Sequence, residues 1–166
     1  MSTEDFVVGV VADTHGHLDP EVLACLADVD VILHAGDIGH ERVLDSLRAV
    51  APVIAVKGNG DDGLRHAHPW DQRVELGETR LLLCHWYDNF GMLHPRIERE
   101  LRAWEPHALV FGHTHNALCE RRGRVLHFNP GYAGPPGQGR LRSVGRLWVG
   151  GDEVRAQVLP LSSRGA

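Results

Sequence analysis

The sequence predicts an α/β protein in which two mixed β-sheets pack face to face with helices on their outer sides. The first half of the chain alternates apolar strand-like runs with helical stretches, which favours parallel strands joined by right-handed crossovers. The second half contains paired strand-like runs around short turns, which favours antiparallel hairpins. We therefore expect two sheets of different character, with helices covering them.

The first half is expected to hold three strands and two helices. The apolar runs and the helical periodicity place the strands at 6–12, 30–35 and 53–57 and the helices at 20–26 and 41–50. Asp19 followed by Pro20 indicates the start of the first helix. Aspartate caps helix ends, and proline lacks an N–H that would have no partner in the first turn.

The second half is expected to be more antiparallel. Residues 73–76 and 79–84 form a predicted hairpin, and 92–104 has the periodicity of an amphipathic helix. Further strands are predicted at 108–111, 117–121, 124–128, 141–149 and 153–159. The stretch 129–139 contains four Gly and three Pro, and we expect it to be a loop near the functional site. Residues 162–166 are expected to form a frayed tail.

The length and composition favour one domain over residues 1–166. A chain of this length buries roughly two thirds of the surface that its unfolded form exposes. Hydrophobic residues make up 43% and charged residues 23%, and no apolar stretch of about 18 residues could cross a bilayer. The N-terminus lacks the basic region and cleavage site of a secretory signal, so we expect a cytoplasmic protein without a membrane partner.

The charge and the cysteines exclude further classes of protein. A net charge of -5 argues against a protein that holds long nucleic acid through its phosphates. Cys25, Cys84 and Cys119 lie far apart without C-x-x-C spacing, which argues against a disulfide framework or a thiolate zinc site. We expect all three to be small buried or half-buried side chains.

Side chains that bind metals follow five of the apolar runs. They are Asp13 and His15, Asp37, Asn59, His85, and His113 with His115. Because open sheets build reactive centres at the carboxyl ends of their strands, we expect these side chains to lie close together. Carboxylate, carboxamide and imidazole groups suit divalent manganese, iron, nickel, cobalt or zinc. Taken singly, each motif has a structural explanation: Asp13 could cap a turn, and Asn59 between two glycines is typical of a turn.

Taken together, these motifs resemble those of the calcineurin-like metallophosphoesterase superfamily, and the short chain resembles its small bacterial and archaeal phosphodiesterase branch. The ordered set is Asp13-x-His15, Gly36-Asp37, Gly58-Asn59-x-Asp61, His85 and Gly112-His113-x-His115. The resemblance implies a four-layer α/β/β/α fold, which agrees with the two packed sheets expected from the strand pattern. It also implies two divalent ions, manganese in the first place, with iron, nickel, cobalt or zinc as alternatives.

The resemblance also implies a role for each motif residue. One metal would be held by Asp13, His15 and His115, the other by Asn59, His85 and His113, and Asp37 would bridge the two. Two divalent ions about 3.5–4 Å apart need such an anionic bridge, and together they lower the pKa of a shared water to give hydroxide near neutral pH. Asp61 is expected to orient an imidazole. We expect Asp37, Asn59, His85 and Asp61 to act most directly in catalysis.

The sequence departs from the family pattern at three places. Gly60 follows the asparagine ligand where several branches have a catalytic histidine. His40 and Glu41 stand where the protein phosphatases carry the Asp-Arg of their GDxxDR motif, which disfavours a protein phosphatase. Trp86 follows His85 where the small phosphodiesterases usually have glycine. With Tyr87 and Phe90 it forms an aromatic loop that either stacks a base or aromatic ester, or packs on the next helix.

The other histidines are expected to divide into three groups. His34 lies inside a strand and is expected in the core, whereas His66, His68, His94 and His107 are expected at the surface or in hinges. His17, His40 and His127 are candidates to contact the metal ligands.

The function expected from this pattern is hydrolysis of small phosphodiesters by a hydroxide that bridges two metals. A phosphomonoesterase or nucleotide phosphatase of the same family is the nearer alternative. The more distant alternative is a non-catalytic scaffold, such as the retromer subunit that has this fold and has lost ligands. All seven ligand positions are present here, which argues against the scaffold because a cluster of carboxylates and imidazoles is costly to bury. A small phosphoester is the expected partner, and a homodimer or higher homo-oligomer is an open alternative to a monomer.

Overall fold

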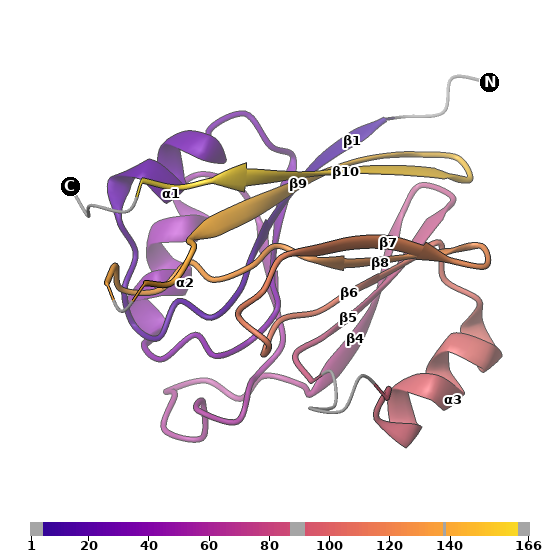
Figure 1. Ribbon diagram of the computed structural model, residues 1–166, viewed down its shortest axis with the longest axis horizontal. Coiled ribbons are helices and arrows are strands. Elements are labelled where there is room, and N and C mark those ends of the chain that lie inside the picture. Colours follow the sequence, from indigo (N-terminus) through magenta and orange to yellow (C-terminus); the bar gives the residue numbers. More distant parts are fainter. Residues whose placement is uncertain (1–4, 87–91, 138, 163–166) are drawn as a thin grey trace.

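The computed structural model describes residues 5–86, 92–137 and 139–162, which form two five-stranded sheets (Figure 1). The first sheet has the order β10-β9-β1-β2-β3. Its strands are β1 (Phe6–Val11), β2 (Val31–His34), β3 (Val53–Ala55), β9 (Ser143–Gly150) and β10 (Glu153–Pro160). The first half of the chain and the C-terminal hairpin therefore share one sheet.

The second sheet has the order β4-β5-β6-β8-β7. Its strands are β4 (Asp71–Leu76), β5 (Thr79–Cys84), β6 (Ala108–Val110), β7 (Leu118–Arg122) and β8 (Val125–Asn129). The helices of the described residues are α1 (Pro20–Cys25), α2 (Glu41–Arg48) and α3 (Pro95–Trp104). Both sheets are mixed, as the sequence predicts.

Three hydrophobic clusters show the four layers. Between the sheets, alternate residues of β1 and β2 such as Val10 and Leu33 pack with Leu83 of β5 and Val110 of β6. The outer face of the first sheet is covered by apolar side chains of α1 and α2, among them Val22, Leu26, Val43, Leu44 and Leu47. On the outer face of the second sheet, Ile97 of α3 lies in a cluster with Leu82 and Leu109. The inner strands β2, β5 and β6 bury both faces, which explains why the sequence shows continuous apolar runs there.

The strand pairing confirms the parallel first half and the more antiparallel second half. In the first sheet, β1 pairs with β2 and β2 with β3 in parallel, and β9 joins β1 antiparallel. In the second sheet, β5 pairs with β6 and β6 with β8, also in parallel. Only the hairpins β4–β5 and β7–β8 are antiparallel among its described pairs. The expected hairpin β9–β10 is antiparallel as well, so antiparallel pairs outnumber parallel ones among the described strands of the second half.

Two local expectations are wrong. The third helix begins at Pro95 rather than at 92, because the His94 side chain accepts the Arg96 N–H as an N-cap and Pro95 supplies the first helical residue. Cys119 is exposed on β7, whereas Cys84 is buried and Cys25 half-buried, as expected.

Burial bears out the expected positions of His34, His66 and His94. His34 is fully buried in β2, and both His66 and His94 are exposed. His68 and His107 are half-buried instead of lying openly at the surface.

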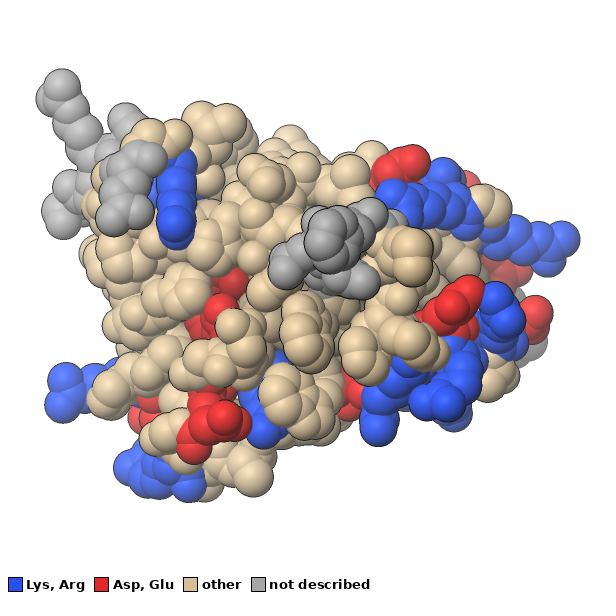
Figure 2. Space-filling model, turned by 60° about the horizontal axis from the view of Figure 1, so that its bottom comes forward, with Lys and Arg blue, Asp and Glu red and all other residues tan. Residues whose placement is uncertain are grey.

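The charged side chains of one face are shown in Figure 2. On its right-hand side, Lys and Arg side chains alternate with Asp and Glu and do not form a continuous basic surface. None of the helices in the described part of the chain has the length and apolar character needed to cross a bilayer.

Candidate metal centre

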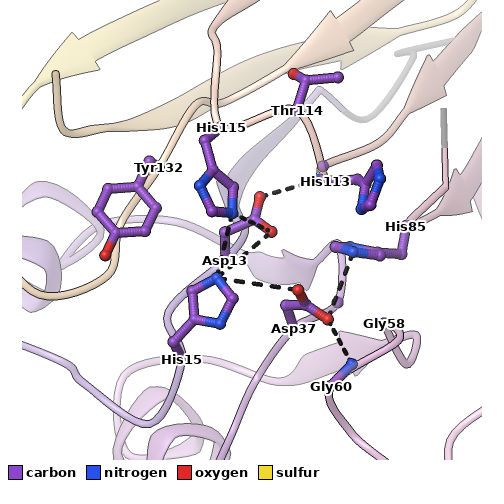
Figure 3. Close-up of polar contacts among 12 residues, drawn as sticks. Asp13, His15, Asp37, Gly58, Gly60, His85, His113, Thr114, His115 and Tyr132 are labelled. Atoms are coloured by element: carbon purple, nitrogen blue, oxygen red, sulfur yellow. Dashed lines mark hydrogen bonds and ion pairs between the residues drawn. The ribbon is translucent and has the colours of Figure 1, made fainter. Parts of the chain in front are cut away.

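The predicted ligands Asp13, His15 and His115 come together at the ends of β1 and β6. His115 Nε2 lies 3.4 Å from Asp13 Oδ1 and 3.2 Å from His15 Nε2, and His15 Nε2 lies 4.0 Å from Asp13 Oδ1 (Figure 3). One ligand atom from each residue falls within 4.8 Å of the other two. The three side chains therefore converge closely enough to share one cation.

A second group joins Asp13 to Asp37 and His85, which follow β2 and β5. His85 Nε2 lies 3.5 Å from Asp37 Oδ1, and ligand atoms of the three residues again lie within 4.8 Å of one another. Asp37 also faces the first group, since its Oδ2 lies 3.9 Å from His15 Nε2. One carboxylate oxygen of Asp37 thus points toward each group.

Two buried polar atoms in these groups lack hydrogen-bond partners. They are Asp13 Oδ1 and His85 Nε2, on side chains that are 0% and 2% exposed. His85 Nδ1 lies 2.7 Å from the carbonyl oxygen of Ala35, so Nδ1 must donate and Nε2 keeps a lone pair. A buried carboxylate oxygen and a buried imidazole lone pair without partners are costly, and a divalent cation would satisfy both. The donor set fits such an ion.

The glycines that precede Asp37 and Asn59 allow the loops to approach. A Cβ on Gly36, whose φ is +89°, would lie 2.7 Å from ring atoms of His85. A Cβ on Gly58 would lie 2.1 Å from Asp37 Oδ1. These glycines let the first sheet's loops reach His85 of the second sheet.

Five of the predicted ligands have a left-handed backbone. The φ angles are 55° at Asp13, 48° at His15, 53° at Asp37, 71° at His113 and 60° at His115. This conformation costs a residue with a Cβ about 1–2 kcal/mol, less for aspartate. Such strain gathers at functional sites, where surrounding contacts hold it in place.

The carboxylate of Asp61 does not orient an imidazole, and that expectation is wrong for the contacts described. Its Oδ2 accepts the backbone N–H groups of Ile38 at 3.1 Å and Gly58 at 2.8 Å, and its Oδ1 accepts that of Gly39 at 2.9 Å. Asp61 is buried, with 4% of its surface exposed. It therefore fastens the loop of Asp37 to the loop of Asn59.

His113 lies beside His85, and Asn59 lies on the loop that contacts Asp37. Neither group of converging ligand atoms includes His113, although its ring centroid lies 5.2 Å from that of His85. Burial, followed by the neighbouring His85, lowers the pKa of His113, which favours the neutral form that binds metals. Asn59 is exposed, and the next residue, Gly60, donates its N–H to Asp37 Oδ1 at 3.0 Å.

Three residues near the ligands were not singled out from the sequence. The ring of Tyr132 lies 4.8 Å from that of His115, and Arg140 Nη1 lies 3.0 Å from His115 Nδ1. Asn129 donates to the carbonyl oxygen of Gly112 and to Thr114 Oγ1. Tyr132 belongs to the Gly/Pro-rich stretch that was expected near the site, and Arg140 directly follows it. No ligand spacing marks either residue.

The remaining candidates make contacts outside the two groups of converging ligand atoms. His17 Nε2 lies 3.6 Å from Asp19 Oδ2, and His40 Nδ1 accepts the Arg42 N–H as the N-cap of α2. His127 is buried in β8, and burial lowers its pKa. Trp86 both stacks on His94 and contacts His113 edge-on, at centroid distances of 5.7 and 6.2 Å. Tyr87 and Phe90 lie outside the described residues.

Comparisons with known proteins identify relatives of this chain. The protein named "Probable metallophosphoesterase" from Methanocaldococcus jannaschii is 30% identical over 165 residues, covering 93% of this chain and 81% of that protein. Phosphodiesterase YfcE of Escherichia coli K12 is 38% identical over 115 residues, covering 64% of this chain and 58% of that protein.

A solved structure and a family match complete the comparison. Vacuolar protein sorting 29 from Cryptosporidium parvum has a TM-score of 0.76 at 18% identity, covering 95% of this chain and 98% of that chain, which shows a shared fold. The model of the calcineurin-like phosphoesterase superfamily domain matches residues 6–151. With most of its length matched, the chain belongs to the calcineurin-like phosphoesterase superfamily.

Proposed function

We propose that this protein is a dinuclear, metal-dependent phosphodiesterase that acts on small phosphodiesters. The observation that carries the proposal is the pair of buried atoms without partners, Asp13 Oδ1 and His85 Nε2, inside a cluster of two carboxylates and several imidazoles. The relatives named metallophosphoesterase and phosphodiesterase support the same reaction class.

We assign one cation to Asp13, His15 and His115 and the other to Asn59, His85 and His113, with Asp37 between them. Two features support Asp37 as the bridge: Oδ1 faces His85 at 3.5 Å, and Oδ2 faces His15 at 3.9 Å. When bound, divalent ions supply an activated water and neutralise charge on the phosphoryl oxygens. Manganese is the first choice, and iron, nickel, cobalt and zinc suit the same donors.

The protein's own groups prepare the site for the reaction. The Ala35 carbonyl holds His85 in the tautomer whose Nε2 can bind a metal. The Gly60 N–H stabilises the Asp37 carboxylate. Arg140, with Tyr132 and His115, lines a groove beside the cluster, where its guanidinium can donate hydrogen bonds to a phosphoryl oxygen of the substrate.

Position 60 offers no proton to the leaving oxygen. A catalytic acid at such a position typically contributes about 10²–10⁴-fold to the rate. We therefore propose that the enzyme prefers esters whose leaving groups are acidic enough to depart unassisted. The His17 side chain instead contacts Asp19, and the His40 side chain caps the start of α2.

A scaffold with the same fold is the alternative from another class, because vacuolar protein sorting 29 shares this architecture. The unpartnered polar atoms argue against it, since a protein without a cation would gain stability from apolar residues at these positions. The cytoplasmic location and the homo-oligomeric state stay predictions.

The test is an activity panel on protein stripped of metal and reloaded separately with each of the five metals. Its substrates are bis(p-nitrophenyl) phosphate, p-nitrophenyl phosphate and cyclic nucleotides. Faster hydrolysis of the diester than of the monoester is expected. Preference for the monoester would support a phosphomonoesterase instead, and no turnover with any metal would contradict an enzyme.

A matched pair of variants tests the metal assignment. Asp37→Asn should lower both metal occupancy, measured by elemental analysis, and turnover by orders of magnitude. Asp62→Asn is the control, because the Asp62 side chain is 80% exposed and pairs with Lys57 at the surface. Normal occupancy and turnover in Asp37→Asn would overturn the bridging role.

A further inference from the structure

An apolar pocket of about 190 Å³ lies beside the candidate metal centre. It is lined by Trp70, Asp71, Cys84, Trp86, His94, Arg96 and Ile97. Asp71 and Cys84 pair across β4 and β5, at the carboxyl end of β5 from which His85 emerges. The pocket therefore lies at the same end of β5 as His85.

Each tryptophan of the pocket is tied to a ligand loop. Trp86 directly follows His85, and its ring centroid lies 6.2 Å from that of His113 in an edge-on contact. Lys57 Nζ lies 4.1 Å above the ring of Trp70, and the Lys57 N–H donates to the carbonyl oxygen of Pro69. Lys57 immediately precedes Gly58-Asn59. The two indoles thus lie between the pocket and loops that carry predicted ligands.

The lining suits a flat, uncharged ring with polar edges. Cys84, which is 1% exposed, contributes a small buried side chain to this wall. Arg96 Nε donates to Asp71 Oδ2 at 2.6 Å, and the Arg96 side chain remains 61% exposed. The pocket therefore offers aromatic and apolar surface together with the remaining guanidinium N–H groups for a ring acceptor.

Packing of the loop on α3 does not account for both tryptophans. Trp86 does stack on His94, at the start of α3. Yet 45% of Trp86 and 47% of Trp70 stay exposed to solvent, whereas a tryptophan that serves only packing buries most of its ring. Exposed indoles that border a concave apolar site are typical of ligand pockets.

We propose that this pocket binds an aromatic ring carried by one alcohol of the phosphodiester, of the size of a nucleobase or a phenyl group. The inference rests on the proposed phosphodiesterase function and adds its substrate class. The pocket would hold the ring while the phosphoryl group lies at the ligand cluster, so ring-bearing esters would bind more tightly than alkyl esters.

The kinetic test compares three diesters that share a p-nitrophenyl leaving group and differ in the second alcohol, which is methyl, phenyl or the 5′-oxygen of thymidine. In the manganese-loaded parent we expect kcat/KM for one or both ring-bearing esters to exceed that of the methyl ester by roughly 5- to 150-fold, the range that stacking on an aromatic side chain gives. Preference for thymidine over phenyl assigns the pocket to nucleosides, and the reverse assigns it to aryl esters.

Variants at the pocket and away from it separate recognition from folding. Trp70→Leu and Trp86→Leu should each lower the ring-to-methyl ratio toward one. The control is Trp148→Leu on β9, where the half-buried indole lies 6.0 Å from Arg155 and outside the pocket, and it should keep the parent ratio. A parent ratio near one with clear turnover of the methyl ester, or a ratio unchanged in both pocket variants, would overturn the proposal.

A binding measurement keeps the pocket testable if no ester is hydrolysed, an outcome that would count against the proposed function alone. Adenosine and ribose are titrated separately into the manganese-loaded parent while tryptophan fluorescence is recorded. Saturable quenching by adenosine but not by ribose, lost in Trp70→Leu and retained in Trp148→Leu, is expected. Equal responses to adenosine and ribose, or quenching that Trp70→Leu leaves unchanged, would contradict the pocket.

Discussion

Replacing Asp61 with asparagine should destabilise the protein by about 2–4 kcal/mol. The carboxylate accepts three backbone N–H groups at 2.8–3.1 Å, two on Oδ2 and one on Oδ1. An asparagine amide that keeps its oxygen at the Oδ2 position must present its NH₂ group to the Gly39 N–H. One hydrogen bond to a charged acceptor is lost, which costs about 1.5–3 kcal/mol, and the two others lose the charge that strengthens them.

Urea unfolding of metal-free protein at pH 7 measures this loss. Asp62→Asn is the matched control, because its exposed carboxylate pairs with Lys57 at the surface and its loss should change the free energy of unfolding by less than about 0.5 kcal/mol. Asp61→Asn should also weaken metal binding, since Asp37 sits in the loop that Asp61 fastens. A loss below about 1 kcal/mol, or a loss no larger than in Asp62→Asn, would refute the role assigned to Asp61.

Three further variants test other parts of the structure. Arg142→Met removes the partner of the buried Asp19 carboxylate and should lower the free energy of unfolding by about 3–5 kcal/mol. A change below about 1 kcal/mol in denaturant titrations would argue against a stabilising role for this ion pair. Burial lowers the pKa of His34 from 6.5 to about 3. Between these pH values the unfolded chain binds a proton that the folded chain does not. The free energy of unfolding should therefore fall as the pH drops from 6.5 toward 3, by up to about 1.4 kcal/mol per pH unit. His34→Gln should flatten that slope, and an unchanged slope would show that other groups cause it. Arg140→Gln should raise KM about 10-fold or more with metal occupancy unchanged, whereas a fall in occupancy with KM unchanged would indicate that Arg140 serves His115 rather than the substrate.

The apolar pattern predicts most strands because burial on both faces leaves a local signal in the sequence. The runs ending near Ala12, Ala35 and Phe111 are strands or strand ends, and the polar residues after them converge at one edge as expected. The partner of the hairpin β9–β10 could not be predicted in the same way. Its pairing with β1 joins residues more than a hundred positions apart, such as Val7 and Trp148, and no local pattern encodes that choice.

The supporting contacts of the candidate site leave even less trace in the sequence. Asp61 binds backbone N–H groups, which every residue except proline carries, so its partners cannot be identified from residue types. Tyr132 and Arg140 reach His115 from a Gly/Pro-rich segment whose path depends on backbone angles rather than on periodicity. A sequence therefore shows candidate ligands more readily than the groups that orient them.

The left-handed backbone at Asp13, His15, Asp37, His113 and His115 connects the fold to the proposed chemistry. Positive φ is uncommon for a residue with a Cβ, although aspartate and histidine adopt it more readily than most, and all five of these residues are aspartates or histidines. The strain persists because neighbouring loops are fixed: His15 N–H donates to the Asp37 carbonyl oxygen, and His113 N–H donates to Asp13 Oδ2. These contacts hold the imidazoles and carboxylates close to one another. Without a cation, this arrangement is unfavourable because it leaves Asp13 Oδ1 and His85 Nε2 buried without hydrogen-bond partners. A cation bound at this edge would offset both the strain and the buried polar atoms, so the same residues would couple metal binding to the stability of the loops that carry them.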